Sequence, residues 1–174
     1  AKGKEILEAK TKRGVKLVVV DPRRTTLASK ADIWLQIRPG TDCALALGML
    51  NVIINERLYD AEFVGKWCHG FDQFKEGASG YPPEKVSKIT WVSVNQIREA
   101  AEMYATTKPA VLHRGVAVEQ NINSTQTCRA LGALIALTGN LDVPGGNLFS
   151  MRPPGYIDIP WGRFKPDVEV IEKR

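Results

Sequence analysis

Two short loops that each contain a proline and a carboxylate carry the side chains best suited to bind a ligand. The first loop reads DPRRT and contains Asp21, Pro22, Arg23, Arg24 and Thr25. Guanidinium groups bind phosphate through paired hydrogen bonds, and carboxylate and hydroxyl groups bind the hydroxyls of a ribose. The proline restricts the loop, so these side chains are held in place. The same residues would also suit an ordinary solvent-exposed turn, and that alternative stays open.

The second loop reads PGTD and ends with Gly40, Thr41 and Asp42. Its Pro-Gly pair favours a tight turn that lets a ligand approach the backbone closely. Asp42 begins a predicted helix over 42–56, where the positive end of the helix dipole favours a negative charge. A carboxylate there can accept two parallel hydrogen bonds from the N1–H and the exocyclic amine of guanine, and adenine lacks that pair of donors. Thr41 or Asp42 could equally be a plain N-cap of the helix.

Each of these loops follows a short apolar run that is typical of a buried β-strand. Leu17–Val20 is a continuous apolar run rich in valine, the pattern of a strand covered on both faces in a parallel sheet, and Ile33–Ile37 is a second short strand. The carboxyl ends of parallel strands meet at one edge of the sheet, where ligands of α/β folds bind. We therefore predict that both loops contribute to one nucleotide site, although the Gly-x-Gly-x-x-Gly fingerprint of NAD-binding domains is absent.

The rest of the chain alternates between helical and strand-like segments. Helices are predicted at 4–13, Asp42–Glu56, Asp60–His69, Pro83–Ile89, Ser93–Thr106 and Ser124–Leu137, a short strand at Ala110–His113, and a surface loop at 70–83. From Pro144 onward, frequent proline and glycine predict an extended, irregular tail. The alternation indicates an α/β fold, Rossmann-like, with a largely parallel sheet flanked by helices and an irregular C-terminal extension.

The composition fits a globular protein and argues against several classes of function. Of the 174 residues, 44% are hydrophobic and 25% are charged, and the net charge of +5 is spread thinly along the chain. Because there is no dense basic run interleaved with aromatic residues, we expect no nucleic-acid partner. The apolar stretches are too short to span a bilayer, so direct membrane insertion is not expected. The compartment, cytoplasmic or periplasmic, stays open.

Cysteine and histidine are too few and too scattered to indicate a metal site. Cys43, Cys68 and Cys128 lie far apart in apolar helical segments, His69 and His113 are the only histidines, and no CxxC motif is present. We expect the thiols to be buried and to act as small apolar side chains. None of these residues is therefore a candidate metal ligand or catalytic group.

The amino-acid sequences of the two loops and of the segments around them resemble those of one protein family. The first stretch reads KLVVVDPRRTTLASKADIWLQIRPGTDCALALGMLNVIINERLYDAEFV, and the later stretch reads RGVAVEQNINSTQTCRALGALIALTGNLDVPGGNLF. Both closely resemble the molybdopterin oxidoreductases of the dimethyl sulfoxide reductase superfamily, whose usual segments are DPR.T, then PGTD.AL.L.M, then LTGN followed by PGG. The resemblance spans about residues 10–150. Within the family, the segments RGVAVEQ and GNLDVPGG weakly resemble those of the thiosulfate/polysulfide reductase-like and acetylene hydratase-like branches.

The resemblance implies a cofactor of two molybdopterin guanine dinucleotides around one molybdenum or tungsten atom. In the family, the segments that match DPRRT and GTD line the site for a guanine nucleotide half. The family's Gly…Gln segment, which touches the pterin nearer the metal, falls on Arg114, Gly115 and Gln120. By this resemblance, residues 1–108 form a guanine-dinucleotide-binding α/β domain whose first strand is missing. Residues 109–174 begin the adjoining pterin-binding α/β domain, with its Pro- and Gly-rich tail.

The resemblance also implies parts that have no counterpart in this sequence. Family members bind a 4Fe-4S cluster through cysteines near their N-terminus and often ligate the metal by a cysteine, selenocysteine or serine, and Cys43 matches neither role. The chain thus resembles an internal piece of a catalytic subunit that performs two-electron oxygen- or sulfur-atom transfer at a metal held elsewhere, and the chain alone is expected to be inactive. Expected partners are the remaining domains of that subunit and an iron–sulfur electron-transfer subunit.

Two alternatives to this function remain. The chain could belong to a generic nucleotide-binding α/β enzyme that uses another dinucleotide, although the missing Gly-rich fingerprint counts against it. It could also be a non-catalytic binding or assembly module derived from the family. Measuring the affinities for guanine and adenine nucleotides would help to separate these cases, because only a guanine site is expected to bind guanine nucleotides more tightly.

Overall fold

The two predicted strands form and pair in parallel. In the structure, a computed structural model that describes residues 2–149, strand β1 (Val18–Val20) lies beside strand β2 (Ile33–Leu35). The register pairs Val18 with Ile33 and Val20 with Leu35, so both strands end at the same edge of the sheet. Among the described residues these are the only two strands, which makes the parallel sheet smaller than the sequence predicted.

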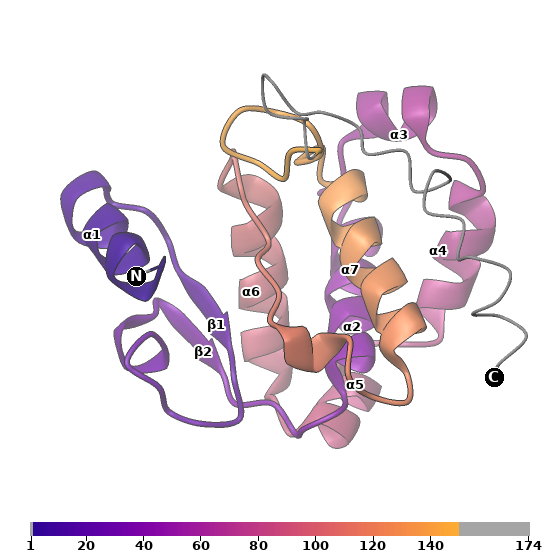
Figure 1. The fold of residues 1–174 in the computed structure, drawn as a ribbon. Helices are drawn as coiled ribbons and strands as arrows, with labels where there is room; N and C mark the ends of the chain where they lie inside the picture. Colours follow the sequence, from indigo (N-terminus) through magenta and orange to yellow (C-terminus); the bar gives the residue numbers. More distant parts are fainter. Residues whose placement is uncertain (1, 150–174) are drawn as a thin grey trace, which may run out of the picture.

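Seven α-helices complete the α/β fold within the described range. In chain order they are α1 (Lys2–Arg13), α2 (Asp42–Asn55), α3 (Ala61–Trp67), α4 (Phe71–Ser79), α5 (Pro83–Thr90), α6 (Val94–Thr106) and α7 (Ser124–Leu137), with single 3-10 turns η1 (Ala28–Lys30) and η2 (Val116–Val118). The small sheet lies between α1 on one side and the group of helices on the other, with α6 as the nearest neighbour of the sheet (Figure 1).

Helix α2 forms the centre of the core because its sequence is apolar almost all round. Nine of its residues are buried, including the fully buried Leu50 and Ile53. Helices α4, α5, α6 and α7 all pack against it. At Gly48 a side chain would be too close to α5, since a Cβ there would lie 2.9 Å from the methyl carbons of Val86. The missing side chain therefore lets the two helices approach one another closely.

The sheet is joined to the helical group through β2 and the start of α6. The Ser-x-x-Gln spacing at the start of α6 is typical of a capping box, and the structure confirms it, because the Ser93 hydroxyl accepts a hydrogen bond from the Gln96 backbone N–H at 3.3 Å. The Gln96 amide in turn donates to the Trp34 carbonyl in β2 at 3.1 Å. The Ile33 and Leu35 side chains of β2 are buried in the core. One side chain thus both caps a helix and ties it to the sheet.

The prediction of a surface loop at 70–83 was wrong, because residues Phe71–Ser79 form helix α4. Glycine and serine in this stretch suggested a loop, but Phe71, Phe74 and Ala78 recur at helical spacing and face the core. The buried Asn51 side chain of α2 donates to the Ala78 carbonyl at 3.0 Å and fixes the end of α4 against the core. Tertiary packing therefore outweighed local propensity.

The predicted strand at Ala110–His113 was also wrong, since this segment pairs with no strand among the described residues. Asparagine side chains take the place of a strand partner. Asn140 accepts a hydrogen bond from the Ala110 N–H at 2.9 Å, and Asn147 accepts from the Leu112 N–H at 2.8 Å and donates to its carbonyl at 2.9 Å. The predicted irregular tail lies largely in 150–174, outside the described residues.

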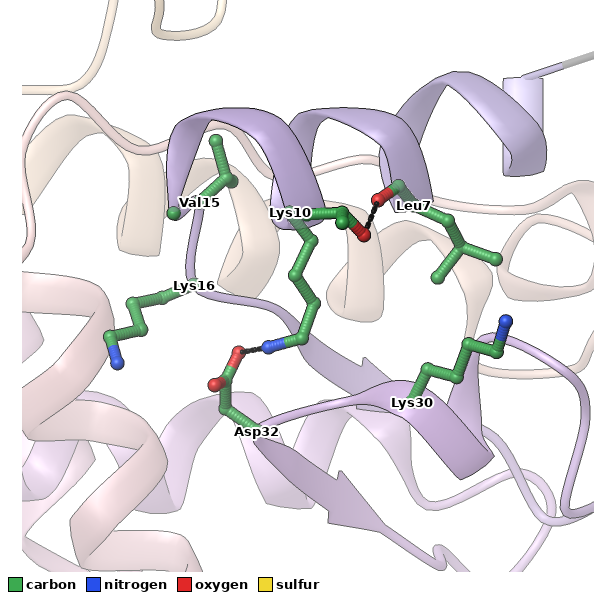
Figure 2. Close-up of a pocket in the computed structure, with 8 residues that line it drawn as sticks. Leu7, Lys10, Val15, Lys16, Lys30 and Asp32 are labelled. Atoms are coloured by element: carbon green, nitrogen blue, oxygen red, sulfur yellow. Dashed lines mark hydrogen bonds and ion pairs between the residues drawn. The ribbon is translucent and has the colours of Figure 1, made fainter.

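Helix α1 is fastened to the sheet by an ion pair between Lys10 and Asp32 (Figure 2). Asp32 stands just before β2 and also accepts a hydrogen bond from the Leu17 backbone N–H at 2.7 Å. These two contacts, with the hydrogen bond from Lys10 first, lower the pKa of Asp32 below its ordinary value of 3.8. Lys10 and Asp32 line a pocket of about 330 Å³, together with Lys16 and Lys30. This pocket lies at the amino ends of the strands, opposite to the predicted nucleotide site.

The Asp32 contacts make a testable contribution to stability. We expect Asp32→Asn to lower the free energy of unfolding at pH 7 by about 1 kcal/mol, because a partly exposed ion pair and a charged hydrogen bond are lost. The folded-state pKa lies below the unfolded value, so the contribution is present above about pH 4 and disappears as the pH falls through the folded-state pKa. Urea titrations of the parent protein and of Asp32→Asn at pH 7 and at pH 3 measure the difference in the free energy of unfolding at each pH.

The exposed Glu99 of α6, which has no ion pair in the described part of the chain, provides the matched control. Glu99→Gln is expected to change the stability at pH 7 by less than about 0.5 kcal/mol. Equal stabilities of Asp32→Asn and the parent protein at pH 7 would contradict the role given to the ion pair.

Candidate functional site

The DPRRT loop is folded back onto β2 by its own backbone and by two side chains of that strand region. The Asp21 carboxylate accepts a hydrogen bond from the Arg23 N–H at 2.8 Å, which closes a local turn. The Trp34 indole donates to the Asp21 carbonyl at 2.9 Å, and the Gln36 amide donates to the Pro22 carbonyl at 3.2 Å. The loop is therefore held rigidly at the carboxyl edge of the sheet.

The two arginines of this loop leave their guanidinium groups at the surface. The Arg24 guanidinium lies 6.0 Å from the centre of the Trp34 ring, while Arg23 is exposed. Within residues 2–149 no ion pair involves either arginine. The Thr25 hydroxyl oxygen accepts from the Ala28 N–H at 3.2 Å, and its hydrogen is still able to donate. This arrangement suits an anionic ligand.

In the PGTD loop the glycine is required by the backbone, whereas the threonine does not cap the helix. Gly40 has a φ of +80°, a conformation that other residues rarely adopt, which agrees with the predicted tight turn. Thr41 occupies the N-cap position of α2, but its hydroxyl donates to the Arg38 carbonyl at 2.7 Å and makes no capping bond. Asp42, partly buried, is the first residue of α2. No ion pair engages it among the described residues.

The two loops start from neighbouring points on the sheet. The Asp21 N–H donates to the Leu35 carbonyl at 3.3 Å, which extends the parallel pairing beyond the last strand residues. The Gln36 side chain, just after β2, then bonds to the Pro22 carbonyl, just after β1. As predicted, both loops follow strands that end at the same edge of a parallel sheet.

The third predicted segment, RGVAVEQ, surrounds η2 at the same end of the molecule (Figure 1). Arg114 forms an ion pair with Glu119 at 2.8 Å, which closes this loop on itself, and Gln120 is exposed. Gly115 has a φ of −87°, so the backbone does not require glycine there. In the described range, no hydrogen bond or ion pair connects this segment with the other two loops. A hollow of about 430 Å³ between η2 and α7 includes Glu119 and Arg129.

Sequence reasoning missed the side chains that hold the loops, although a signal for two of them was present. In the run IWLQI, Ile33, Leu35 and Ile37 are buried, which leaves Trp34 and Gln36 together on the opposite face. This alternation could have identified both as loop supports. No local pattern pointed to the hydrogen bond from the Arg38 N–H to the carbonyl of Thr90 at the end of α5, because it joins segments that are distant in sequence.

The cysteines are partly buried and free, which is less burial than the sequence predicted. Burial first, and then the neighbouring Asp42 carboxylate, raise the pKa of the Cys43 thiol. Burial also raises the pKa of Cys68. Residues 2–149 bring no three His, Cys, Asp or Glu side chains together where a metal ion could bind. Nor does any helix in this range have the length and apolar character needed to cross a membrane.

Comparison with known proteins gives consistent matches over most of the chain. The family described as molybdopterin oxidoreductase matches residues 2–165. Acetylene hydratase of Syntrophotalea acetylenica is 52% identical over 134 residues, which are 77% of this chain and 18% of that protein. Formate dehydrogenase H of Escherichia coli strain K12 is 40% identical over 147 residues, which are 84% of this chain and 20% of that protein.

A solved structure agrees in fold as well as in sequence. Acetylene hydratase from Pelobacter acetylenicus superposes with a TM-score of 0.76 at 51% identity, covering 78% of this chain and 19% of that one. The chain therefore spans about a fifth of the length of the relatives that it matches.

The Asn147 side chain is expected to be needed for the position of the segment that leads into RGVAVEQ. Asn147→Ala leaves the N–H and the carbonyl of Leu112 without their side-chain partner, so we expect a loss of about 1–2 kcal/mol in the free energy of unfolding. Denaturant titration measures this loss. The exposed Asn95 in α6 gives the matched control, and Asn95→Ala is expected to be nearly neutral. Equal losses in the two variants would contradict the assignment.

Proposed function

Because the chain belongs to the molybdopterin oxidoreductase family, within the dimethyl sulfoxide reductase superfamily, we propose that it is the part of a molybdenum or tungsten oxidoreductase that binds molybdopterin guanine dinucleotide. The observation that carries this proposal is that DPRRT and the segment leading into PGTD leave the parallel sheet side by side at its carboxyl edge. The chain spans about a fifth of the length of these relatives. The oxidoreductase activity of the whole protein is therefore also a proposal.

The donors and acceptors at this edge fit a guanine nucleotide. Arg23 and Arg24 present guanidinium groups with no carboxylate partner in the described residues, as a pyrophosphate requires. Asp42 presents a carboxylate that no ion pair within residues 2–149 occupies, as the donor edge of guanine requires. When bound, the metal and its pterins would supply two-electron redox chemistry, such as oxygen- or sulfur-atom transfer.

In this proposal the residues of the chain bind and orient the cofactor. Arg23 and Arg24 neutralise the phosphates, and Asp21 and Thr25 hold ribose hydroxyls. Asp42 accepts the guanine N1–H and amine. Because Trp34 and Gln36 fix the first loop and the Gly40 turn fixes the second, the site is formed before the cofactor arrives, and little ordering entropy is lost on binding.

The pterin half of the cofactor is assigned to the RGVAVEQ segment. Arg114, Gly115 and Gln120 would contact the pterin, with the Arg114–Glu119 ion pair keeping the loop in shape. The division into a guanine-dinucleotide-binding domain over 1–108 and the start of a pterin-binding domain over 109–174 is part of the same proposal. So are a bis-molybdopterin guanine dinucleotide, a 4Fe-4S cluster elsewhere in the parent protein, and an iron–sulfur partner subunit.

The guanine contact predicts a preference that nucleotide titration can measure. Isothermal titration of the chain is expected to give tighter binding of GDP than of ADP, because adenine lacks the paired donors that Asp42 accepts. We expect Asp42→Asn to weaken GDP binding by roughly 10- to 100-fold, since a charged acceptor of two hydrogen bonds is lost. ADP binding should change little, so the preference for GDP should largely disappear.

Asp72 offers a matched control, because it is an exposed aspartate in the first turn of α4. Asp72→Asn removes the same charge from a similar helix position and should leave both affinities unchanged. If ADP bound as tightly as GDP, or if Asp42→Asn left GDP binding intact, the guanine contact would be refuted.

The proposal also places the metal outside this chain. We expect the purified chain to contain molybdenum and tungsten far below one atom per protein by elemental analysis, because the proposed contacts hold only the nucleotide and pterin groups. A stoichiometric amount of either metal, retained after gel filtration, would show that this chain itself holds the metal.

A further inference from the structure

Trp91 combines two features that stability alone does not explain. Its side chain is 70% exposed, although an indole ring gains from burial. Its backbone has a φ of +66°, in the left-handed region, where a bulky residue is an outlier and a glycine or asparagine is the usual choice. The position therefore carries a residue that is unfavourable in both its exposure and its backbone conformation. Strain of this kind persists where the surroundings determine it and points to a function.

The surroundings of Trp91 do determine its conformation. The residues on either side of it, Thr90 and Val92, are both buried, so the chain turns outward at Trp91 and inward again. The Thr90 hydroxyl donates to the Val86 carbonyl at 2.8 Å and accepts from the Val92 N–H at 3.3 Å. The Trp91 N–H donates to the Ser87 carbonyl at 2.9 Å and closes α5. The indole is thus held out from the surface by a fixed backbone.

The ring stands beside the loop that leads into PGTD. The Arg38 N–H donates to the Thr90 carbonyl at 2.8 Å, so the backbones of the loop and of the α5 end are joined directly. The Arg38 guanidinium lies 5.3 Å from the centre of the Trp91 ring. A cation at this distance favours one ring face and orients it. Because the side chain is 70% exposed even with Arg38 beside it, a flat ligand has access to the ring.

We propose that Trp91 is the stacking surface for the nucleobase that the PGTD loop holds. This inference rests on the proposed function, because it assumes that a nucleotide binds at this edge of the sheet. Aromatic rings stack on any base, so Trp91 contributes affinity, whereas the paired hydrogen bonds to Asp42 provide the choice of guanine. Trp91 and Asp42 thus have different signatures in binding: one sets how tightly a nucleotide binds, and the other sets which nucleotide binds.

Trp67 is a natural comparison on the same chain. Its side chain is 69% exposed and has a cation nearby, with the Lys66 amino group 5.5 Å from the ring centre. Trp67 is the last residue of α3, however, and α3 lies at the opposite end of the helical group from the loops after β1 and β2 (Figure 1). A variant of Trp67 therefore matches the change in chemistry without touching the proposed site.

The test measures GDP and ADP binding to the whole chain for Trp91→Asn and Trp91→Phe. We expect Trp91→Asn to weaken GDP and ADP binding by a similar factor, roughly tenfold, because stacking is lost for both bases. Its Tm should equal or exceed that of the parent, because asparagine tolerates the left-handed conformation. Trp91→Phe should keep GDP binding within about threefold. Trp67→Asn should change neither affinity.

Tryptophan fluorescence gives a second readout that does not depend on the stability of the asparagine variant. Stacking of a base on an indole quenches its emission, so GDP should quench the parent protein and Trp67→Phe strongly and Trp91→Phe much less, since only Trp34 of the proposed site then remains. Undiminished quenching in Trp91→Phe, or unchanged GDP affinity in Trp91→Asn while Asp42→Asn loses its preference for GDP, would overturn the role of Trp91 and leave the proposed function standing. A parent chain without any preference for GDP would instead refute the proposed function.

Discussion

The parallel pairing of β1 with β2 is the constraint on which the site depends. Because Val20 and Leu35 end the strands side by side, the chain must leave the sheet twice at the same edge, and each exit carries a proline and an aspartate. An antiparallel pair would have sent the two loops to opposite ends. The pairing therefore brings DPRRT beside the segment that leads into PGTD, where Gln36 bonds to Pro22, 14 positions earlier in sequence. Helix α6 packs against β2, and α6 in turn packs on the central α2, which α4, α5 and α7 also contact.

The loops themselves are stabilised by polar contacts to backbone, and not by burial. Side chains of the β2 region hold the first loop, a hydroxyl and a backbone N–H hold the residues before the second, and asparagines hold the segment before RGVAVEQ. Bonds of this kind fix the backbone while they leave the arginines and Asp42 exposed or only partly buried. A binding site benefits from this combination, since its shape is fixed before the ligand binds and its charged groups stay available to a ligand.

Much of the fold followed from sequence, and the errors share one cause. The two strands, the long apolar α2 and the capping box at Ser93 are local patterns, and the structure confirms them. Helix α4 and the segment 110–113 were predicted wrongly because their state depends on distant partners. Three apolar residues of α4 pack into the core, and two asparagines that follow α7 occupy the hydrogen-bonding groups that a strand partner would have used.

For the site, the sequence by itself determined the chemistry. It supplied the guanidinium groups, the carboxylates and the glycine turn. The order of its residues also identified the molybdopterin oxidoreductase family, because a family resemblance depends on residue identity and order alone. Only the tertiary structure decided how these groups are supported: Trp34 and Gln36 hold DPRRT, and Thr41 binds Arg38 instead of capping α2. It also places the exposed Trp91 beside Arg38, the residue just before PGTD. The reason is physical: the partners of Trp34, Gln36 and Trp91 are brought near by folding, and the backbone conformation of the turn decides which acceptor the Thr41 hydroxyl reaches.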